Sequence, residues 1–178
     1  MLSALRAATA QRHEKLDSGL AIGRPDAMLE DYVKHLQMLH AWLAPLEAWL
    51  ADFADGPQDV SLLPAKARVA LIESDLGDAS LGATDAPAWP ANASAAYRWG
   101  VCYVVEGSQL GGAVLYSRLK TQLAPHPLAY LQGEAEGPGP RWRVFMQAIK
   151  AQVQTGAQID EACLGACDAF DRILALRG

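Results

Sequence analysis

The chain has 178 residues, of which 51% are hydrophobic and 20% are charged, a composition typical of a folded globular protein. This length predicts a single domain over residues 1–178 with one sizeable core. The net charge of -5 argues against nucleic acid and anionic membranes as partners. No apolar run has the length of a transmembrane helix, and the N-terminal residues lack a hydrophobic signal core. We therefore expect a cytoplasmic protein.

The first half of the chain has the hydrophobic spacing of helices. A first helix is expected over 2–18, and a second, long helix over 27–53. Asp26, in the turn that separates them, is the expected cap of the second helix. Pro45 is expected to kink or restart that helix. Five residues share one stripe of the first helix: Leu2, Leu5, Thr9, His13 and Leu16.

The second half also reads as helices, separated by segments rich in Gly and Pro. A helix over 64–76 and a linker over 77–94 are expected. Asn92 or Ser94 then opens a long helix that runs to about Leu123, and a loop follows to Pro140. Two last helices are expected over 142–154 and 158–176, and their short link predicts antiparallel neighbours. The fold class is therefore all-α, an up-and-down helical bundle.

Three glycines lie inside the long helix, namely Gly107, Gly111 and Gly112. Each costs roughly 1 kcal/mol relative to alanine in a helix interior. Gly107 and Gly111 are four residues apart, so they lie on one face. Such a face allows either a close helix–helix crossing or a flat partner that reaches the helix backbone. The sequence pattern leaves both explanations open.

His13 is the most suggestive single residue. A lone histidine on an apolar stripe is often a satisfied core residue, but Asp17 lies one helical turn further on. Its carboxylate can accept a hydrogen bond from one ring nitrogen and leave the other free to bind a metal. His35, His40 and His126 offer no second ligand at chelating spacing. Other ligands would have to come from elsewhere, as a porphyrin supplies them in heme.

The three cysteines do not form a recognisable metal or redox motif. Cys102, Cys163 and Cys167 lack CxxC spacing. Cys163 and Cys167 are four residues apart on a helical segment, which favours shared burial over a metal pair.

An ordered set of motifs covers nearly the whole chain: Leu5 to Thr9, His13 to Asp17, Arg24 to Asp26, Tyr32, Pro45 to Glu47, Tyr103 to Gly112, Trp142 to Phe145, and Ala166, Phe170 and Leu174. In this order the motifs resemble those of the bacterial heme oxygenases. The most similar subgroup produces biliverdin and is often associated with bacteriophytochromes.

The resemblance implies a heme held between the first helix and a kinked distal helix. His13 corresponds to the proximal ligand of the heme iron, and Gly107, Gly111 and Gly112 to the glycines that pack over the other heme face. Ser108 stands where mammalian-type members carry an Asp. A hydroxyl cannot act as a carboxylate, so we expect ordered water and backbone groups to carry protons.

Heme propionates need cationic or hydroxyl partners at the mouth of the pocket. Arg6 matches a basic propionate-binding position of the family. Tyr103, Arg143 and Lys150 are further candidates. Phe170 is expected in the core and also as a possible heme wall, while Trp142 and Phe145 are interpreted as core residues.

The activity implied is the opening of heme to biliverdin, CO and ferrous iron by successive rounds of O2 activation. Electrons would come from an external reductase or ferredoxin, and a bacteriophytochrome would accept the biliverdin. Three alternatives stay open at this point. They are a non-catalytic heme-binding or heme-shuttling protein on the same fold, a thiaminase-like hydrolase that uses a nucleophilic cysteine, and a purely structural helical module.

Overall fold

The computed structural model describes residues 1–79, 81 and 87–177. Within these residues the fold is all-helical and contains no strand, in agreement with the sequence-based expectation. The helices are α1 (Leu2–Asp17), α2 (Leu29–Leu50), α3 (Arg68–Leu76), α4 (Ala95–Gln122), α5 (Ala129–Gln132), α6 (Gly139–Gln152) and α7 (Gly156–Ala175), with 3-10 turns η1 (Ala21–Gly23) and η2 (Gly56–Gln58). In this described part, no helix has both the length and the apolar character to cross a membrane.

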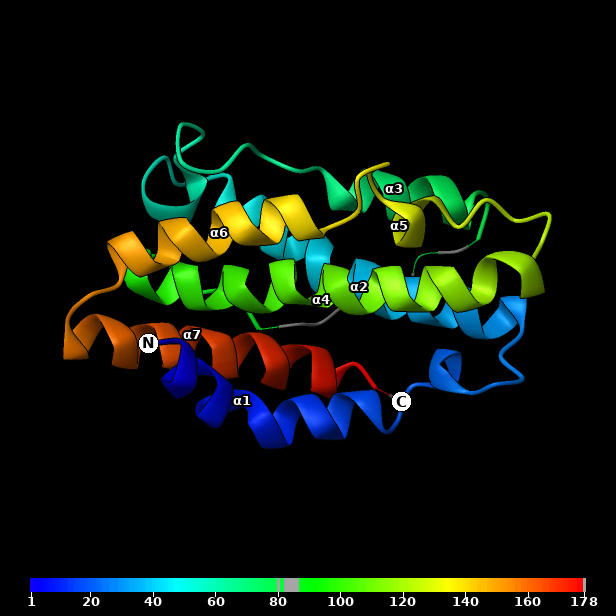
Figure 1. The fold of residues 1–178 in the computed structure, drawn as a ribbon, viewed down its shortest axis with the longest axis horizontal. Helices are drawn as coiled ribbons and strands as arrows, with labels where there is room; N and C mark the ends of the chain where they lie inside the picture. The colour runs from blue at the N-terminus through cyan, green and yellow to red at the C-terminus, as the bar shows by residue number, and fades with distance from the viewer. Residues whose placement is uncertain (80, 82–86, 178) are drawn as a thin grey trace.

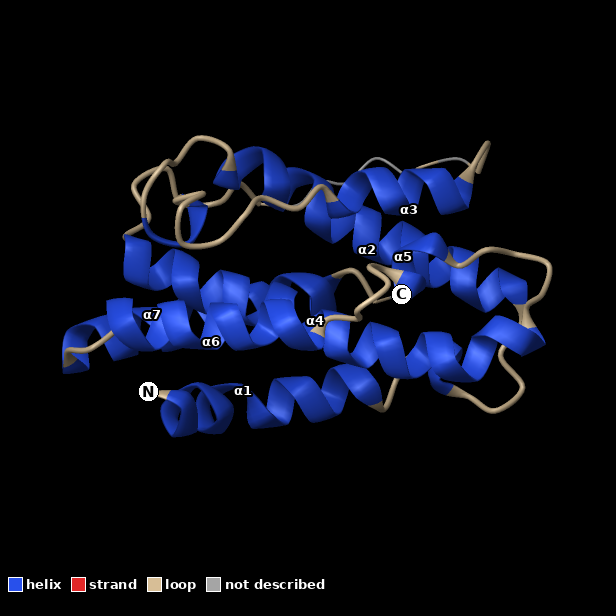
Figure 2. Cartoon of the chain, turned by 45° about the horizontal axis from the view of Figure 1, so that its top comes forward, coloured by secondary structure: helices blue, strands red, loops and turns tan. Residues whose placement is uncertain are grey.

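Helix α4 runs through the centre of the bundle (Figure 1). Helix α6 lies on one side of it, and α7 and α1 lie on the other. Helix α2 packs against α3, and the short helix α5 packs against both α3 and α4. Figure 2 shows that loops connect the helices, and α1 packs against α7.

Helices α4 and α7 cross with their backbones in direct contact. A Cβ atom on Gly100 would lie 1.8 Å from the carbonyl oxygen of Ala162, and one on Gly165 would lie 2.1 Å from that of Tyr97. Only glycine fits at such a distance. A close helix–helix crossing therefore exists in this protein, but it uses Gly100 and Gly165 rather than the three glycines singled out from the sequence.

Helix α2 corrects two expectations about its ends and its continuity. It begins at Leu29, and its first turn is capped by the Asp31 carboxylate, which accepts the Met28 N–H at 2.8 Å. The prediction that Asp26 caps this helix was therefore wrong. The helix also runs through Pro45 without restarting. The neighbouring side chains of Leu43 and Leu46 are fully buried, and such packing offsets a proline cost of about 3 kcal/mol.

Other boundaries are close to those expected. Ser94 caps α4, because its Oγ accepts the Tyr97 N–H at 3.1 Å. Helix α3 begins at Arg68, four residues later than expected. The helix α5 inside the second loop was not predicted. The described part of the 77–94 linker is outside any helix, and its residues 80 and 82–86 lie outside the described residues.

The last two helices are antiparallel, as predicted, but they are not neighbours. Helix α7 packs on α4 and α1, while α6 packs on α4 from the opposite side (Figure 1). The physical reason is the stripe of small residues along α7, which gives the closest approach to α4. These residues are Ala162, Gly165, Ala166 and Ala169.

Candidate functional site

A cavity of about 580 Å³ lies among α1, α2, α4 and α7, with contributions from α5 and α6. Its volume is in the range of small-molecule and cofactor sites, and its lining is mostly apolar. The exposed side chains of Arg6, His13 and Asp17 mark its mouth. Trp42 and Leu39, which are buried, form part of its inner wall.

His13 projects from α1 at the mouth of this cavity. Its Nδ1 atom lies 3.0 Å from Asp17 Oδ2, the contact expected from the sequence. In the tautomer whose proton is on Nδ1, the nitrogen next to Asp17, Nε2 keeps a free lone pair. The ring centroid of Phe170 lies 5.8 Å from that of His13. The imidazole is 64% exposed, so it belongs to the cavity mouth rather than to the core.

Helix α1 is held in register with α7 by a bidentate ion pair. Arg12 Nε and Nη2 lie 2.8 Å and 2.9 Å from the two carboxylate oxygens of Asp171. Asp171 follows Phe170 directly, and Arg12 precedes His13. The pair therefore fixes the imidazole and the phenyl ring relative to one another across two helices.

The three predicted glycines line the cavity on the α4 side. A Cβ atom on Gly111 would meet no heavy atom within 4 Å. On Gly107 it would lie 3.8 Å from the Trp142 ring, and on Gly112 3.7 Å from Leu131 Cδ2. None of these glycines is therefore required by a close helix crossing. Their effect is to leave a length of α4 backbone uncovered on the cavity side.

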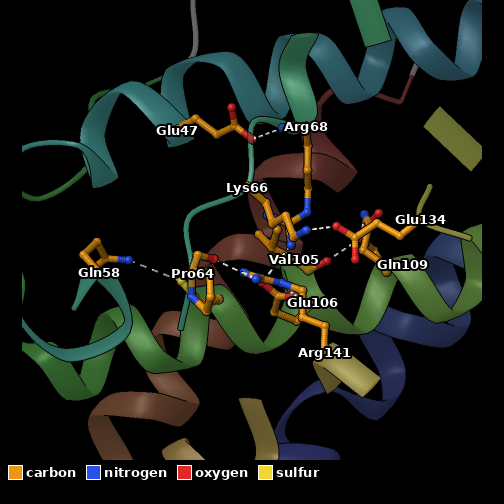
Figure 3. A network of polar contacts seen from close by, with 12 residues as sticks. Glu47, Gln58, Pro64, Lys66, Arg68, Val105, Glu106, Gln109, Glu134 and Arg141 are labelled. Atoms are coloured by element: carbon orange, nitrogen blue, oxygen red, sulfur yellow. Dashed lines mark hydrogen bonds and ion pairs between the residues drawn. The ribbon is translucent and has the colours of Figure 1, made fainter. Parts of the chain in front are cut away.

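A buried charge cluster sets the rotation of α4 at this point (Figure 3). Glu106 is 5% exposed and lies between two arginines. Arg68 Nη2 donates to its Oε1 at 2.7 Å, and Arg141 donates to both carboxylate oxygens at 2.9 Å. Burial alone would raise the pKa of Glu106, but the two guanidinium groups outweigh it and lower that pKa. With Glu106 anchored to α3 and α6, the adjacent Gly107 faces the cavity.

Most of the residues predicted as a site are brought together by the fold. Eight of them line the cavity: Arg6, His13, Tyr103, Gly107, Ser108, Gly111, Gly112 and Phe170. Arg143 and Lys150 are exposed on α6 and are not among the lining residues. Phe145 is fully buried, as expected. Trp142 was interpreted as core, but it also lines the cavity and packs against Tyr103.

Sequence reasoning missed the contribution of α2 and α5 to the walls. His35, Met38, Leu39 and Trp42 line the cavity from α2, and Tyr130 and Leu131 do so from α5. The α2 set has the spacing of one helix face, a signal present in the sequence. Burial lowers the pKa of His35 to about 4, so its ring is neutral at neutral pH. Its Nδ1 is buried and has no hydrogen-bond partner within the part of the chain that the structure describes.

The cysteines have the wrong environment for nucleophilic catalysis. Burial raises the pKa of Cys102 to about 12, and it also raises the pKa of Cys163 and Cys167. The reactive thiolate is therefore disfavoured at all three positions. None of them lines the cavity. This arrangement argues against the hydrolase alternative.

Comparisons with known proteins agree with the resemblance drawn from the motifs. The family model described as heme oxygenase matches residues 1–176. A protein described as heme oxygenase from Xanthomonas campestris pv. campestris (strain 8004) is 33% identical over 157 residues, or 84% of this chain and 90% of that protein. The solved NO- and CO-bound heme oxygenase from Neisseria meningitidis shares the fold, with a TM-score of 0.74 at 24% identity, over 97% of this chain and 87% of that chain. The chain therefore belongs to the heme oxygenase family.

Proposed function

We propose that this protein binds heme in the cavity and cleaves it to biliverdin, CO and ferrous iron, with O2 and electrons from an external donor. One observation carries the proposal. The imidazole of His13 on α1 and the uncovered glycine face of α4 line the same mostly apolar cavity. Membership of the heme oxygenase family supports it independently.

The donor set at the mouth fits a single axial ligand. His13 Nε2 would ligate the iron, because Nδ1 is engaged by Asp17. The carboxylate favours one tautomer and one orientation of the imidazole. The side chain of Phe170 limits rotation of the ring from the α7 side.

The opposite wall provides space rather than ligands. When bound, heme supplies the iron on which O2 is activated, and the protein supplies binding, orientation and exclusion of water. Side chains at Gly107, Gly111 and Gly112 would occupy space next to α4 that a flat macrocycle and a diatomic gas need. The buried side chains of Leu39 and Trp42 on the inner wall would limit the access of water to that space.

The charged propionates would stay at the wet mouth, because a buried carboxylate without a partner is costly. Arg6 is exposed there and is the proposed cationic partner, with the Tyr103 hydroxyl as a second hydrogen-bonding group. Arg143 and Lys150 are not included in this proposed arrangement, because they are not among the lining residues.

The proposal extends to the partners that the motif resemblance implies. A reductase or ferredoxin would supply the electrons, and a bacteriophytochrome would accept the biliverdin. The support for both is the resemblance of the motifs in 5–17 and 103–112 to the phytochrome-associated subgroup.

Reconstitution with heme tests the function directly. The protein should give a Soret band on titration and then form biliverdin and CO when ascorbate or a ferredoxin system is added under O2. A stable Soret band without biliverdin would instead identify a heme carrier on the same fold. Absence of heme uptake would contradict both.

Two histidines, one in the cavity lining and one outside it, provide a test variant and a control variant for ligation of the heme iron. His13→Ala should lose the ferric heme spectrum of the wild type and its turnover, and added imidazole should restore part of both. His40→Ala is the control, because His40 lies outside the cavity lining and pairs with Glu73. An unchanged spectrum and full turnover in His13→Ala would refute the assignment of the ligand.

A further inference from the structure

A group of polar side chains lies on the cavity wall where α5 meets α4. Tyr130 and Ser108 both line the cavity, and Gln109 connects them. Gln109 belongs to the α4 segment next to the Glu106 cluster (Figure 3). The tyrosine is 5% exposed, so its hydroxyl is one of the few buried polar groups on this wall.

The hydrogen bonds fix which atoms donate and which accept. Ser108 Oγ donates its single proton to the Val105 carbonyl at 2.7 Å, so it can only accept from Gln109. The Gln109 amide nitrogen lies 3.3 Å from Ser108 Oγ and 3.1 Å from Tyr130 Oη. It therefore donates to both oxygens. The Tyr130 oxygen acts as an acceptor in this contact.

A buried carboxylate binds the backbone at Tyr130 and so fixes the position of this residue. Asp75 is 7% exposed and accepts the backbone N–H groups of Tyr130 and Ala129 at 2.8 Å and 3.0 Å. Asp75 also accepts the Tyr32 hydroxyl proton at 2.6 Å. These bonds fix the start of α5, and Leu128 immediately before it adopts the left-handed conformation. The hydroxyl is therefore held at one place on the wall.

The phenol is also protonated under ordinary conditions. Burial raises the pKa of Tyr130, although its contacts with Gln109 and Ser108 act in the opposite direction. A neutral phenol that already accepts one hydrogen bond has a proton to donate into the cavity. Donation to an acceptor in a water-poor site is worth more than the same bond in bulk water.

We propose that Tyr130 is the hydrogen-bond donor to a water molecule or diatomic ligand held on the Gly107 and Gly111 side of the cavity, an inference that rests on the proposed function. The serine at position 108 leaves this wall without a carboxylate, and the Tyr130 hydroxyl supplies the exchangeable proton there. Gln109 and Ser108 orient the hydroxyl, and Asp75 positions the residue.

The C–O stretching band of the ferrous CO complex tests this donor without turnover. A donor next to the bound gas draws electron density toward its oxygen and lowers the C–O frequency. Tyr130→Phe removes only the hydroxyl, so the band should shift to higher frequency and lose its sensitivity to D2O. The rate of biliverdin formation should fall at least about tenfold, while heme affinity and melting temperature stay near wild type.

Tyr116→Phe is the matched control. Tyr116 is half-buried on α4 and lies outside the cavity lining, so this variant should keep the wild-type band and rate. An identical CO band in wild type and Tyr130→Phe would overturn the inference. A wild type that binds heme and CO but forms no biliverdin would contradict the proposed function alone, because the CO band needs only binding.

Discussion

The Asp17 carboxylate lies 3.0 Å from His13 Nδ1, one turn along the same helix and at the open mouth of the cavity. Both side chains are 64% exposed, so the contact contributes little to folding. Its value lies in the orientation of the imidazole.

We expect Asp17→Ala to weaken heme binding by about tenfold to a hundredfold, the usual effect of removing a group that orients a metal-bound histidine. The melting temperature of the protein without heme should not change. Heme titration followed at the Soret band measures the first effect and thermal unfolding the second. Glu14→Ala removes an exposed carboxylate beside His13 and serves as control; an equal loss in both variants would remove the special role of Asp17.

The glycines of α4 predict opposite effects on stability and on binding. Gly111→Ala should raise the free energy of unfolding by about 1 kcal/mol, because alanine favours the helix and its Cβ meets no atom. Gly111→Leu should leave the fold intact but depress heme binding and turnover by filling the cavity. Denaturant titration and heme titration of both variants check this. Normal heme degradation by Gly111→Leu would show that the cavity is not the heme site.

Gly100→Ala is the counterpart on the same helix. Its Cβ would lie 1.8 Å from the Ala162 carbonyl oxygen, so α4 and α7 would have to separate. We expect a loss of about 3 kcal/mol or more in the free energy of unfolding, comparable to overpacking a core. Thermal or urea unfolding measures it, and wild-type stability in this variant would contradict the close crossing.

Glu106→Gln should destabilise the protein by about 3 kcal/mol, because Arg68 and Arg141 would then share a buried site without a countercharge. The lowered pKa of Glu106 sets the sign of the pH dependence. Its stabilisation is present above the ordinary carboxyl pKa of about 4.3 and is lost as pH falls through the lower folded value. Glu136→Gln, in an exposed loop, is the control. Equal urea midpoints for both variants would contradict the prediction.

His35 predicts a second loss of stability at acid pH. Its pKa is about 4 in the folded protein and about 6.5 when unfolded, so the unfolded chain binds the extra proton between these values. Stability should therefore be complete above pH 6.5 and fall by about 3 kcal/mol as pH drops to 4. Urea unfolding across this range measures it. The slope should be much smaller in His35→Gln; the same slope in both proteins would place its origin elsewhere.

The motifs predicted which residues share the cavity better than the hydrophobic pattern predicted the packing. His13, Asp17 and the glycines at 107, 111 and 112 could be placed because each is local to one helix, where spacing determines the face. The partners of α6 and α7 could not be read from loop length, since the contact is decided by Gly100 and Gly165 on separate helices. Sequence periodicity carries no direct signal for such a pair.

Tyr130 and Asp75 show that the cavity, too, depends on contacts between separate elements that sequence periodicity does not indicate. Helix α5 has only four residues, too few for any periodic pattern, and it is held by a carboxylate more than fifty residues away. Pro45 shows the converse case, in which a strong local signal is overruled because buried neighbours continue the helix. Arg143 and Lys150 were chosen for charge alone, and charge does not specify which way a helix surface faces.

The close approach of α4 and α7, where Gly100 meets Ala162 and Gly165 meets Tyr97, also defines a pivot. The two backbones approach most closely there, so a tilt of α4 relative to α7 would turn about this point. Gly111 lies eleven residues further along α4, about 16 Å from the pivot at 1.5 Å per residue. A tilt of about 5° would therefore carry Gly111 through about 1.4 Å, roughly the radius of a water molecule. A small change in the crossing angle at Gly100 would therefore produce a much larger displacement of the cavity wall at Gly111.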